Sequence, residues 1–258
     1  MADTTVGIAA PDVATSKVPE ITLGFWAIKV LATTLGETGG DAVSMSMGLG
    51  YLVGTAIFMT AFIAAAAAQI SIKRFSPFLY WATIIASTTV GTTLADFADR
   101  FLGIGYAGGS LLLLGLLLTS LFVWHRVSGS VDVRSVSTPQ SEFFYWLTIM
   151  FSQTLGTALG DWTADSAGLG YLGAAIVFCG LLLLVAALHV WTAMSHTLLF
   201  WAAFILTRPL GAAVGDFLDK PIATGGLEVS RYSATLVLLG LMAAGIVLLP
   251  QRAARIAH

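Results

Sequence analysis

Residues 26–41 read WAIKVLATTLGETGGD, and the pattern within them returns three more times along the chain. A tryptophan is followed, after nine intervening residues, by a glycine; after three more intervening residues come a glycine or alanine and then an aspartate. The other copies are WATIIASTTVGTTLAD at 81–96, WLTIMFSQTLGTALGD at 146–161 and WAAFILTRPLGAAVGD at 201–216. A pattern kept at such regular spacing indicates internal repeats of one structural unit.

The composition indicates a membrane protein. Only 26 of the 258 residues are charged, 57% are hydrophobic, and the mean hydropathy is +0.88. A soluble domain has about 25% charged residues, so this chain lacks the polar surface to cover a water-soluble fold. A bilayer crossing needs about 20 apolar residues, which leaves room for about eight helices. The net charge of −2 argues against nucleic acid as a partner.

Two apolar segments per repeat predict an all-α integral membrane protein, with eight transmembrane helices from four helical-hairpin repeats of the same orientation. The expected first helices cover 23–40, 78–95, 143–160 and 198–215, and the second helices cover 49–70, 105–124, 170–191 and 232–249. The predicted organisation is a disordered cytoplasmic tail at 1–20, repeats one and two at 21–126, a cytoplasmic linker at 127–141, repeats three and four at 142–250, and a cytoplasmic tail at 251–258.

The basic residues predict the orientation. Most of them fall on one side of the expected spans: Lys17, Lys73, Arg74, Arg126, Arg134, Arg252 and Arg255. The other side has only Arg100, Lys220 and Arg231. Loops rich in lysine and arginine stay in the cytoplasm, so both termini are expected there and the repeated aspartates face outward.

Polar residues recur only in the first helices, while the second are almost purely aliphatic. We therefore expect the first helices to pack together and the second to face lipid, with the small residues allowing close helix contact. The repeated tryptophans are expected at the cytoplasmic interface, and Lys29 is expected to extend its ammonium toward the same interface.

The four repeated aspartates, Asp41, Asp96, Asp161 and Asp216, would then converge at one depth. Carboxylate oxygens are the ligands that hard divalent cations such as Mg, Ca and Mn prefer, so these residues form a candidate metal site. Glu37 is expected to act as an inner ligand or proton acceptor. The alternative is that each aspartate only ends or caps a helix.

A stripe of side chains leads away from these aspartates. The residues seven and eleven positions after each tryptophan share one helix face with the aspartate. They predict a pathway lined by Thr33, Thr88, Thr92, Gln153, Thr157 and Arg208. Charges within a membrane point to function, and Arg208 would balance Glu37. The alternative is a buried ion pair that only fixes the packing.

The blocks TLGETGGD, TVGTTLAD, TLGTALGD and PLGAAVGD resemble a family of bacterial integral membrane proteins that are known only as uncharacterised membrane-anchored proteins. The resemblance covers the chain from about Trp26 to Pro250 and implies a multi-pass protein of the bacterial inner membrane. More loosely, LGETGGD is similar to the Glu-x-Gly-Asp signature of small manganese and calcium exporters, although Glu37 and Asp41 are four positions apart here instead of three.

These observations favour transport of a cation, divalent and manganese-like, as the function. The ion is the substrate, and no cofactor is expected. No enzyme motif such as GxSxG, a phosphate loop or HExxH occurs, so an enzyme is not expected. A proton or small-anion channel or carrier using Arg208 and Glu37, and a non-transporting scaffold, are the alternatives. The expected partners are the lipid bilayer and a small inorganic ion, and the chain is compatible with a homo-oligomer.

The distribution of basic residues predicts the topology. Reporter fusions at Arg74 and Arg134 should be cytoplasmic, and fusions at Leu102 and Ala223 should be external, because only the first two positions lie in arginine- and lysine-rich loops. Activity of alkaline phosphatase and fluorescence of a cytoplasmic reporter at each position measure this. A single position with the opposite result would overturn the orientation.

Overall fold

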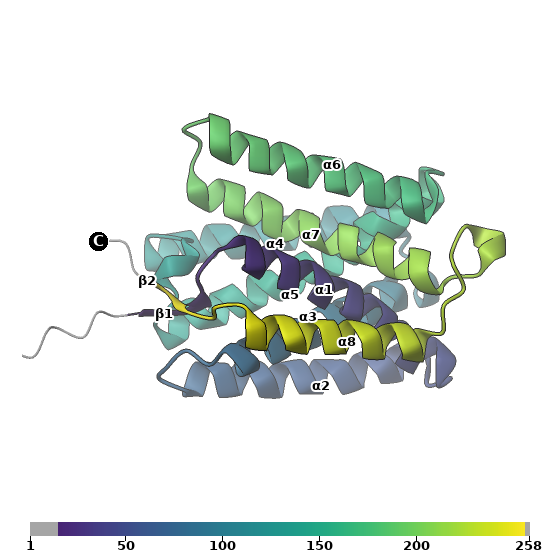
Figure 1. The fold of residues 1–258 in the computed structure, drawn as a ribbon, viewed down its shortest axis with the longest axis horizontal. Coiled ribbons are helices and arrows are strands. Elements are labelled where there is room, and N and C mark those ends of the chain that lie inside the picture. Colours follow the sequence, from purple (N-terminus) through teal and green to yellow (C-terminus); the bar gives the residue numbers. More distant parts are fainter. Residues whose placement is uncertain (1–14, 256–258) are drawn as a thin grey trace, which may run out of the picture.

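The computed structural model describes residues 15–255, which form eight long helices and two short strands (Figure 1). The helices are α1 (Leu23–Asp41), α2 (Gly50–Ser71), α3 (Pro77–Asp96), α4 (Tyr106–Ser128), α5 (Pro139–Asp161), α6 (Gly170–Trp191), α7 (His196–Asp219) and α8 (Arg231–Leu248). The strands β1 (Thr15–Pro19) and β2 (Ala253–Arg255) pair antiparallel. The predicted all-helical class is confirmed.

Helices α1, α3, α5 and α7 form a closed ring, which we call the inner ring. Each packs on the next, and α7 packs on α1. The other four helices lie outside, with α2 against α3, α4 against α5, α6 against α7, and α8 against α1. The second helix of a repeat therefore covers the first helix of the following repeat. The two helices of a repeat therefore do not form their main contact with each other. The second helix packs on the next repeat, and α8 of the fourth repeat packs on α1 of the first.

The repeated small residues explain how closely the inner helices approach. A Cβ added at Gly91 would lie 2.9 Å from the backbone carbonyl carbon of Gln153 on α5. Equivalent glycines meet the next inner helix in the same way: Gly36 meets Thr88, Gly156 meets Arg208, and Gly211 meets Thr33. Any side chain would push the helices apart, so the repeated glycine is required by packing.

Threonine hydroxyls join the same pairs of helices. Thr88 Oγ1 donates to the Ala32 carbonyl oxygen at 3.2 Å, and Thr33 Oγ1 donates to the Thr207 carbonyl oxygen at 3.1 Å. Both bonds run from the seventh position after a tryptophan to the sixth position of the preceding inner helix. Both hydroxyls are buried, and such bonds satisfy groups that would otherwise be costly to bury.

The repeated aspartates do not end the helical path. After Asp41, Asp96 and Asp161 the chain continues through a five-residue π-helical turn, at Ala42–Ser46, Phe97–Phe101 and Trp162–Ser166. Two glycines with positive φ then reverse the chain in each case, as Gly48 (69°) and Gly50 (75°) do in the first repeat. Repeat four differs, because α7 continues to Asp219 and a longer loop follows. In the first three repeats the aspartate is thus the last residue of its α-helix, and the helical path continues beyond it as a π-helical turn.

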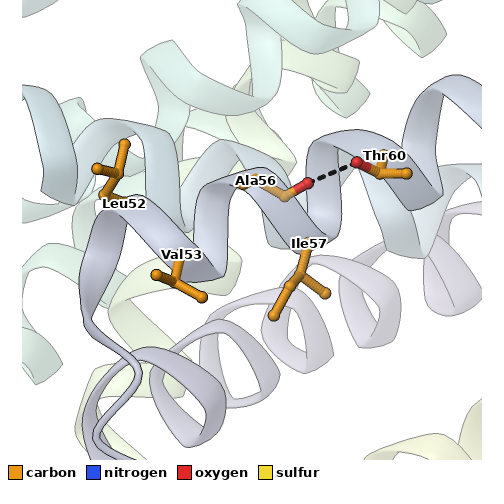
Figure 2. Close-up of a pocket in the computed structure, with 5 residues that line it drawn as sticks. All are labelled: Leu52, Val53, Ala56, Ile57 and Thr60. Carbon is orange, nitrogen blue, oxygen red and sulfur yellow. Dashed lines mark hydrogen bonds between the residues drawn. The ribbon is translucent and has the colours of Figure 1, made fainter.

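Within residues 15–255, six helices are long and apolar enough to cross a membrane, namely α2, α3 with the turn that follows it, α4, α6, α7 and α8. Their outward faces expose large aliphatic side chains. A shallow groove on α2, lined by Leu52, Val53, Ala56, Ile57 and Thr60, is typical of this surface (Figure 2). Thr60 satisfies its hydroxyl by donating to the Ala56 carbonyl oxygen at 2.8 Å, so the surface stays compatible with lipid.

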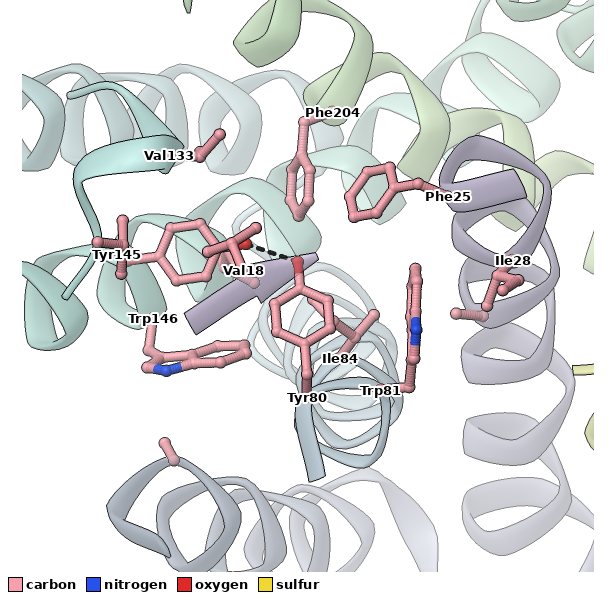
Figure 3. Close-up of a cluster of buried hydrophobic side chains, with 14 of the residues drawn as sticks. Val18, Phe25, Ile28, Tyr80, Trp81, Ile84, Val133, Tyr145, Trp146 and Phe204 are labelled. Atoms are coloured by element: carbon pink, nitrogen blue, oxygen red, sulfur yellow. Dashed lines mark hydrogen bonds between the residues drawn. The ribbon is translucent and has the colours of Figure 1, made fainter. Parts of the chain in front are cut away.

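The four repeated tryptophans lie at one end of the bundle, where three of them are buried and Trp26 is partly buried. Trp81 and Trp146 are buried, with Tyr80, Tyr145 and Phe204, in one aromatic cluster (Figure 3). The indole N–H of Trp81 donates to Gln251 Oε1 at 3.0 Å. We call this the tryptophan end of the ring; the opposite end carries the four aspartates and is called the aspartate end.

Part of the N-terminal segment is more ordered than the sequence predicts, and a short strand forms in the C-terminal segment. β1 lies within the range expected to be a disordered tail, and β2 lies within the second expected tail; both are at the tryptophan end (Figure 1). Val18 of β1 is buried in the aromatic cluster, which explains why this segment folds (Figure 3). The expected disorder at residues 1–14, and the last residues of the tail, 256–258, lie outside the described residues.

The ring packing predicts that adding one methyl group destabilises the protein at an inner helix but not at an outer helix. Gly91→Ala should lower the free energy of unfolding by about 1–3 kcal/mol, because the new Cβ meets backbone that cannot move aside. Gly115→Ala on α4 is the matched control, since nothing lies within 4 Å of its Cβ position. Unfolding of both purified variants in detergent measures the difference. Equal stability of the two would contradict the close-packed ring.

Candidate functional site

Side chains at fixed positions after each tryptophan form successive levels along the axis of the inner ring. The third position gives Lys29, Ile84, Ile149 and Phe204; the seventh gives Thr33, Thr88, Gln153 and Arg208; the eleventh gives Glu37, Thr92, Thr157 and Ala212; and the fifteenth gives the four aspartates. All of these side chains are buried. The structure thus brings every predicted site residue to the interior of one ring.

At the aspartate end the four carboxylates are held in two pairs. Arg100 Nε lies 2.7 Å from Asp96 Oδ1, and its Nη2 lies 3.3 Å from Asp161 Oδ2. Lys220 Nζ lies 3.1 Å from Asp216 Oδ1 and also contacts Asp41 Oδ2. Each cation therefore joins the aspartate of its own repeat to the aspartate of the next repeat.

Arg100 and Lys220 occupy the same place in repeats two and four, nineteen residues after the tryptophan. Repeats one and three have Met45 and Asp165 there. Sequence reasoning placed both cations in loops and missed their role. The available signal was the four-residue spacing from Asp96 to Arg100 and from Asp216 to Lys220, which places the charges on one helix face.

A third carboxylate distinguishes the Lys220 pair. Glu37, Asp41 and Asp216 each offer an oxygen, and these oxygens lie within 4.8 Å of one another. We call these residues the carboxylate trio. All three are buried, and Asp41 Oδ1 accepts no hydrogen bond from any described residue. Three converging carboxylates with a free oxygen can ligate a hard cation.

Lys220 keeps its charge in this setting. Burial alone would lower the pKa of Lys220, but the adjacent carboxylates of Asp216, Asp41 and Asp219 raise it above its ordinary value. Arg231 adds a further positive charge, with its Nε 2.9 Å from Asp219 Oδ2 and 3.8 Å from Asp41 Oδ2. The aspartate end therefore combines concentrated acid with tethered cations.

One level deeper, Arg208 joins all four inner helices. Its Nη2 lies 2.9 Å from Glu37 Oε2 on α1, 2.6 Å from Thr92 Oγ1 on α3, and 2.5 Å from Thr157 Oγ1 on α5. The backbone of Arg208 lies one turn nearer the tryptophan end than Glu37, Thr92 and Thr157. At the level of those three residues, which the guanidinium reaches, α7 has the small residue Ala212. The predicted pairing of Arg208 with Glu37 is present.

The residues expected to line a pathway are instead packed together. Thr33 and Thr88 bond to backbone, as described above, and both are fully buried. Gln153 is fully buried too, and neither polar atom of its amide has a hydrogen-bond partner among residues 15–255. The side chains predicted to line a pathway therefore fill the axis of the ring.

Lys29 corrects the expectation that it reaches the interface. The residue is fully buried, and its Nζ lies 4.1 Å from the centroid of the Phe204 ring. It faces the axis because it stands four residues before Thr33 on the same stripe as Glu37 and Asp41. Lys29 is therefore buried because it lies on the axial side of α1, although it is close to the end of that helix.

The tryptophan end is closed by β1 and by two tyrosines. The hydroxyls of Tyr80 on α3 and Tyr145 on α5 lie 2.6 Å apart, in the same buried cluster as Val18 (Figure 3). Lys17 Nζ anchors β1 through Glu142 Oε1 at 2.6 Å and through the carbonyl oxygen of Gln69 at 3.1 Å. The structure thus has an acidic site at one end and a sealed aromatic layer at the other.

Fold and site together define a four-repeat helical protein with several helices that could span a membrane and a ring of carboxylates at one end. The chain belongs to the family described as Repeat of Unknown Function (DUF347), which matches residues 24–75, 79–130, 144–195 and 199–252. The four repeats are thereby confirmed. Neither a curated protein nor a solved structure matches the chain. The looser similarity to small cation exporters gains no support.

The Arg208 contacts predict strong coupling with Glu37. Glu37→Gln should lower the free energy of unfolding by about 3–5 kcal/mol, because Arg208 keeps a buried charge without its counter-charge. Adding Arg208→Gln should recover part of this loss. A double-mutant cycle by detergent unfolding measures the coupling, and strictly additive effects would show that the two side chains act independently.

Proposed function

We propose that this protein transports divalent cations across a membrane, and that the carboxylate trio is the ion-binding site. The observation that carries the proposal is the approach of three buried carboxylate oxygens from Glu37, Asp41 and Asp216 to within 4.8 Å. Burying like charges so close together is unfavourable unless a cation joins them. Lys220 and Arg208 supply positive charge to these carboxylates in the structure, and a divalent cation would take over part of that role.

The ligand chemistry favours a hard ion. The trio offers only carboxylate oxygens, which suit Mn, Ca and Mg better than softer metals. Manganese remains the favoured substrate, and it would be cargo and not a resident cofactor. Asp96 and Asp161 would add negative charge at the same end and concentrate cations near the site.

The membrane arrangement follows from the ring. We propose that all eight helices cross the bilayer, including α1 and α5, whose charged residues face the interior of the ring and not lipid. The distribution of lysine and arginine supports cytoplasmic termini in the bacterial inner membrane, with the aspartate end outside. The trio would then be reached from the external side.

Transport requires the packed axis to open. Arg208 contacts all four inner helices, so its withdrawal from Glu37, Thr92 and Thr157 would connect the trio to the deeper levels. Thr33, Thr88 and Gln153 would then line the path, and movement of β1 would open the tryptophan end. Such alternation between closed states is the ordinary requirement for a carrier.

A proton carrier is the second candidate, favoured by the contact of Glu37 with Arg208 deep in the ring. A carboxylate next to an arginine can exchange a proton for its ion pair during a transport cycle. Proton flux that does not depend on any metal would favour this candidate. The third possibility, a scaffold without transport, predicts neither ion binding nor flux.

Manganese binding tests the proposal. Isothermal titration of purified protein with Mn²⁺ should show binding that Asp41→Asn and Asp216→Asn each weaken by about tenfold or more, because an amide keeps the shape but removes the charge. Asp96→Asn is the matched control, since its carboxylate is outside the trio, and its effect should be smaller. Binding should also weaken in acid, because protons compete with the metal for carboxylates.

Flux completes this test. Proteoliposomes containing the wild type should move Mn²⁺, and the two trio variants should not. If wild type and all variants bind and transport alike, or none binds, the trio is a packing feature and the cation proposal fails.

A further inference from the structure

We propose that Lys220 is a tethered competitor for the transported cation, an inference that rests on the proposed function. Its ammonium occupies the place between Asp41 and Asp216 that a divalent cation would take. The ion would enter only as the ammonium withdraws, so Lys220 would set the affinity of the site and reset it after release.

The geometry supports an exchange of one cation for another. Lys220 Nζ contacts Asp41 Oδ2 and lies 3.1 Å from Asp216 Oδ1, which are two of the three residues of the trio. A metal bound to the same two carboxylates would compete directly with the ammonium. Asp41 Oδ1, which accepts no hydrogen bond within the described part of the chain, would be a further ligand atom.

The position of Lys220 in the chain allows its side chain to move while helix α7 stays in place. Lys220 is the first residue after α7, and its carbonyl oxygen accepts a bond from the Glu228 amide at 2.9 Å. The Leu227 amide likewise bonds to the Phe217 carbonyl oxygen at 2.7 Å, so the loop is fixed to the helix end. A lysine side chain has a flexible four-carbon stem, which allows the ammonium to leave while this backbone stays in place.

Arg100 shows what a permanent clamp looks like in the same fold. It holds Asp96 and Asp161 from the equivalent repeat position, but the level beneath it offers Thr92 and Thr157 in place of a third carboxylate. A planar guanidinium fits a pair of carboxylates in a fixed geometry, whereas an ammonium is a compact point charge that a metal ion can replace. Only the Lys220 side thus combines a replaceable cation with three ligands.

The experiment compares Mn²⁺ affinity by isothermal titration of the purified full chain in detergent. Lys220→Met and Lys220→Gln remove the charge and should each tighten binding by about tenfold or more, because the competing cation is gone. Lys220→Arg keeps the charge and should give no gain. Arg100→Met, the matched change in repeat two, should leave the affinity near the wild-type value.

The outcomes separate this inference from the function beneath it. If wild type binds Mn²⁺ but neither neutral variant binds it more tightly, Lys220 is a structural clamp and the inference is wrong while the site stands. An equal gain from Lys220→Arg or from Arg100→Met would also overturn it, since loosening of the ring end would then be the cause. If no form of the protein binds Mn²⁺, the proposed function fails and the inference falls with it.

Discussion

The contact of each repeated glycine with the next inner helix is the constraint on which the rest of the structure depends. Gly36, Gly91, Gly156 and Gly211 leave no room for a side chain, and the last of them closes the ring by meeting Thr33 of the first repeat. Because the four contacts are equivalent, the four inner helices stand at the same depth and in the same direction. Every axial level, including the ring of aspartates, follows from this register.

The backbones of the four repeats are arranged almost symmetrically, but the side chains at equivalent positions differ. Cations at one repeat position divide the aspartates into two pairs, and Glu37 makes the pair of Asp41 and Asp216 different from the other. Arg208 breaks the symmetry again by reaching across the axis to three other helices. Function is expected where a repeated fold departs from its own symmetry, because packing alone does not require the departure.

Much of this arrangement could be predicted from the sequence. The spacing of tryptophan, glycine and aspartate predicted the four repeats, and the polar stripes predicted which helices lie inside. Lys29 was misplaced because its surroundings were judged from its distance to the helix end, whereas the closed ring buries side chains at every depth. The ion pairs of Arg100 with Asp161 and of Lys220 with Asp41 join different repeats. They could not be predicted, because only the closed ring shows which repeats are neighbours. The swapped packing of the outer helices has no local signal either.

The central claim is that Glu37, Asp41 and Asp216 hold a divalent cation. An experimental structure determined with Mn²⁺, with data collected at the manganese absorption edge, tests it most directly. The account predicts one anomalous peak bonded to oxygens of these three residues, with the Lys220 ammonium displaced from Asp41. A structure with no peak there, or with Mn²⁺ bound elsewhere and Lys220 still between the two aspartates, would contradict it.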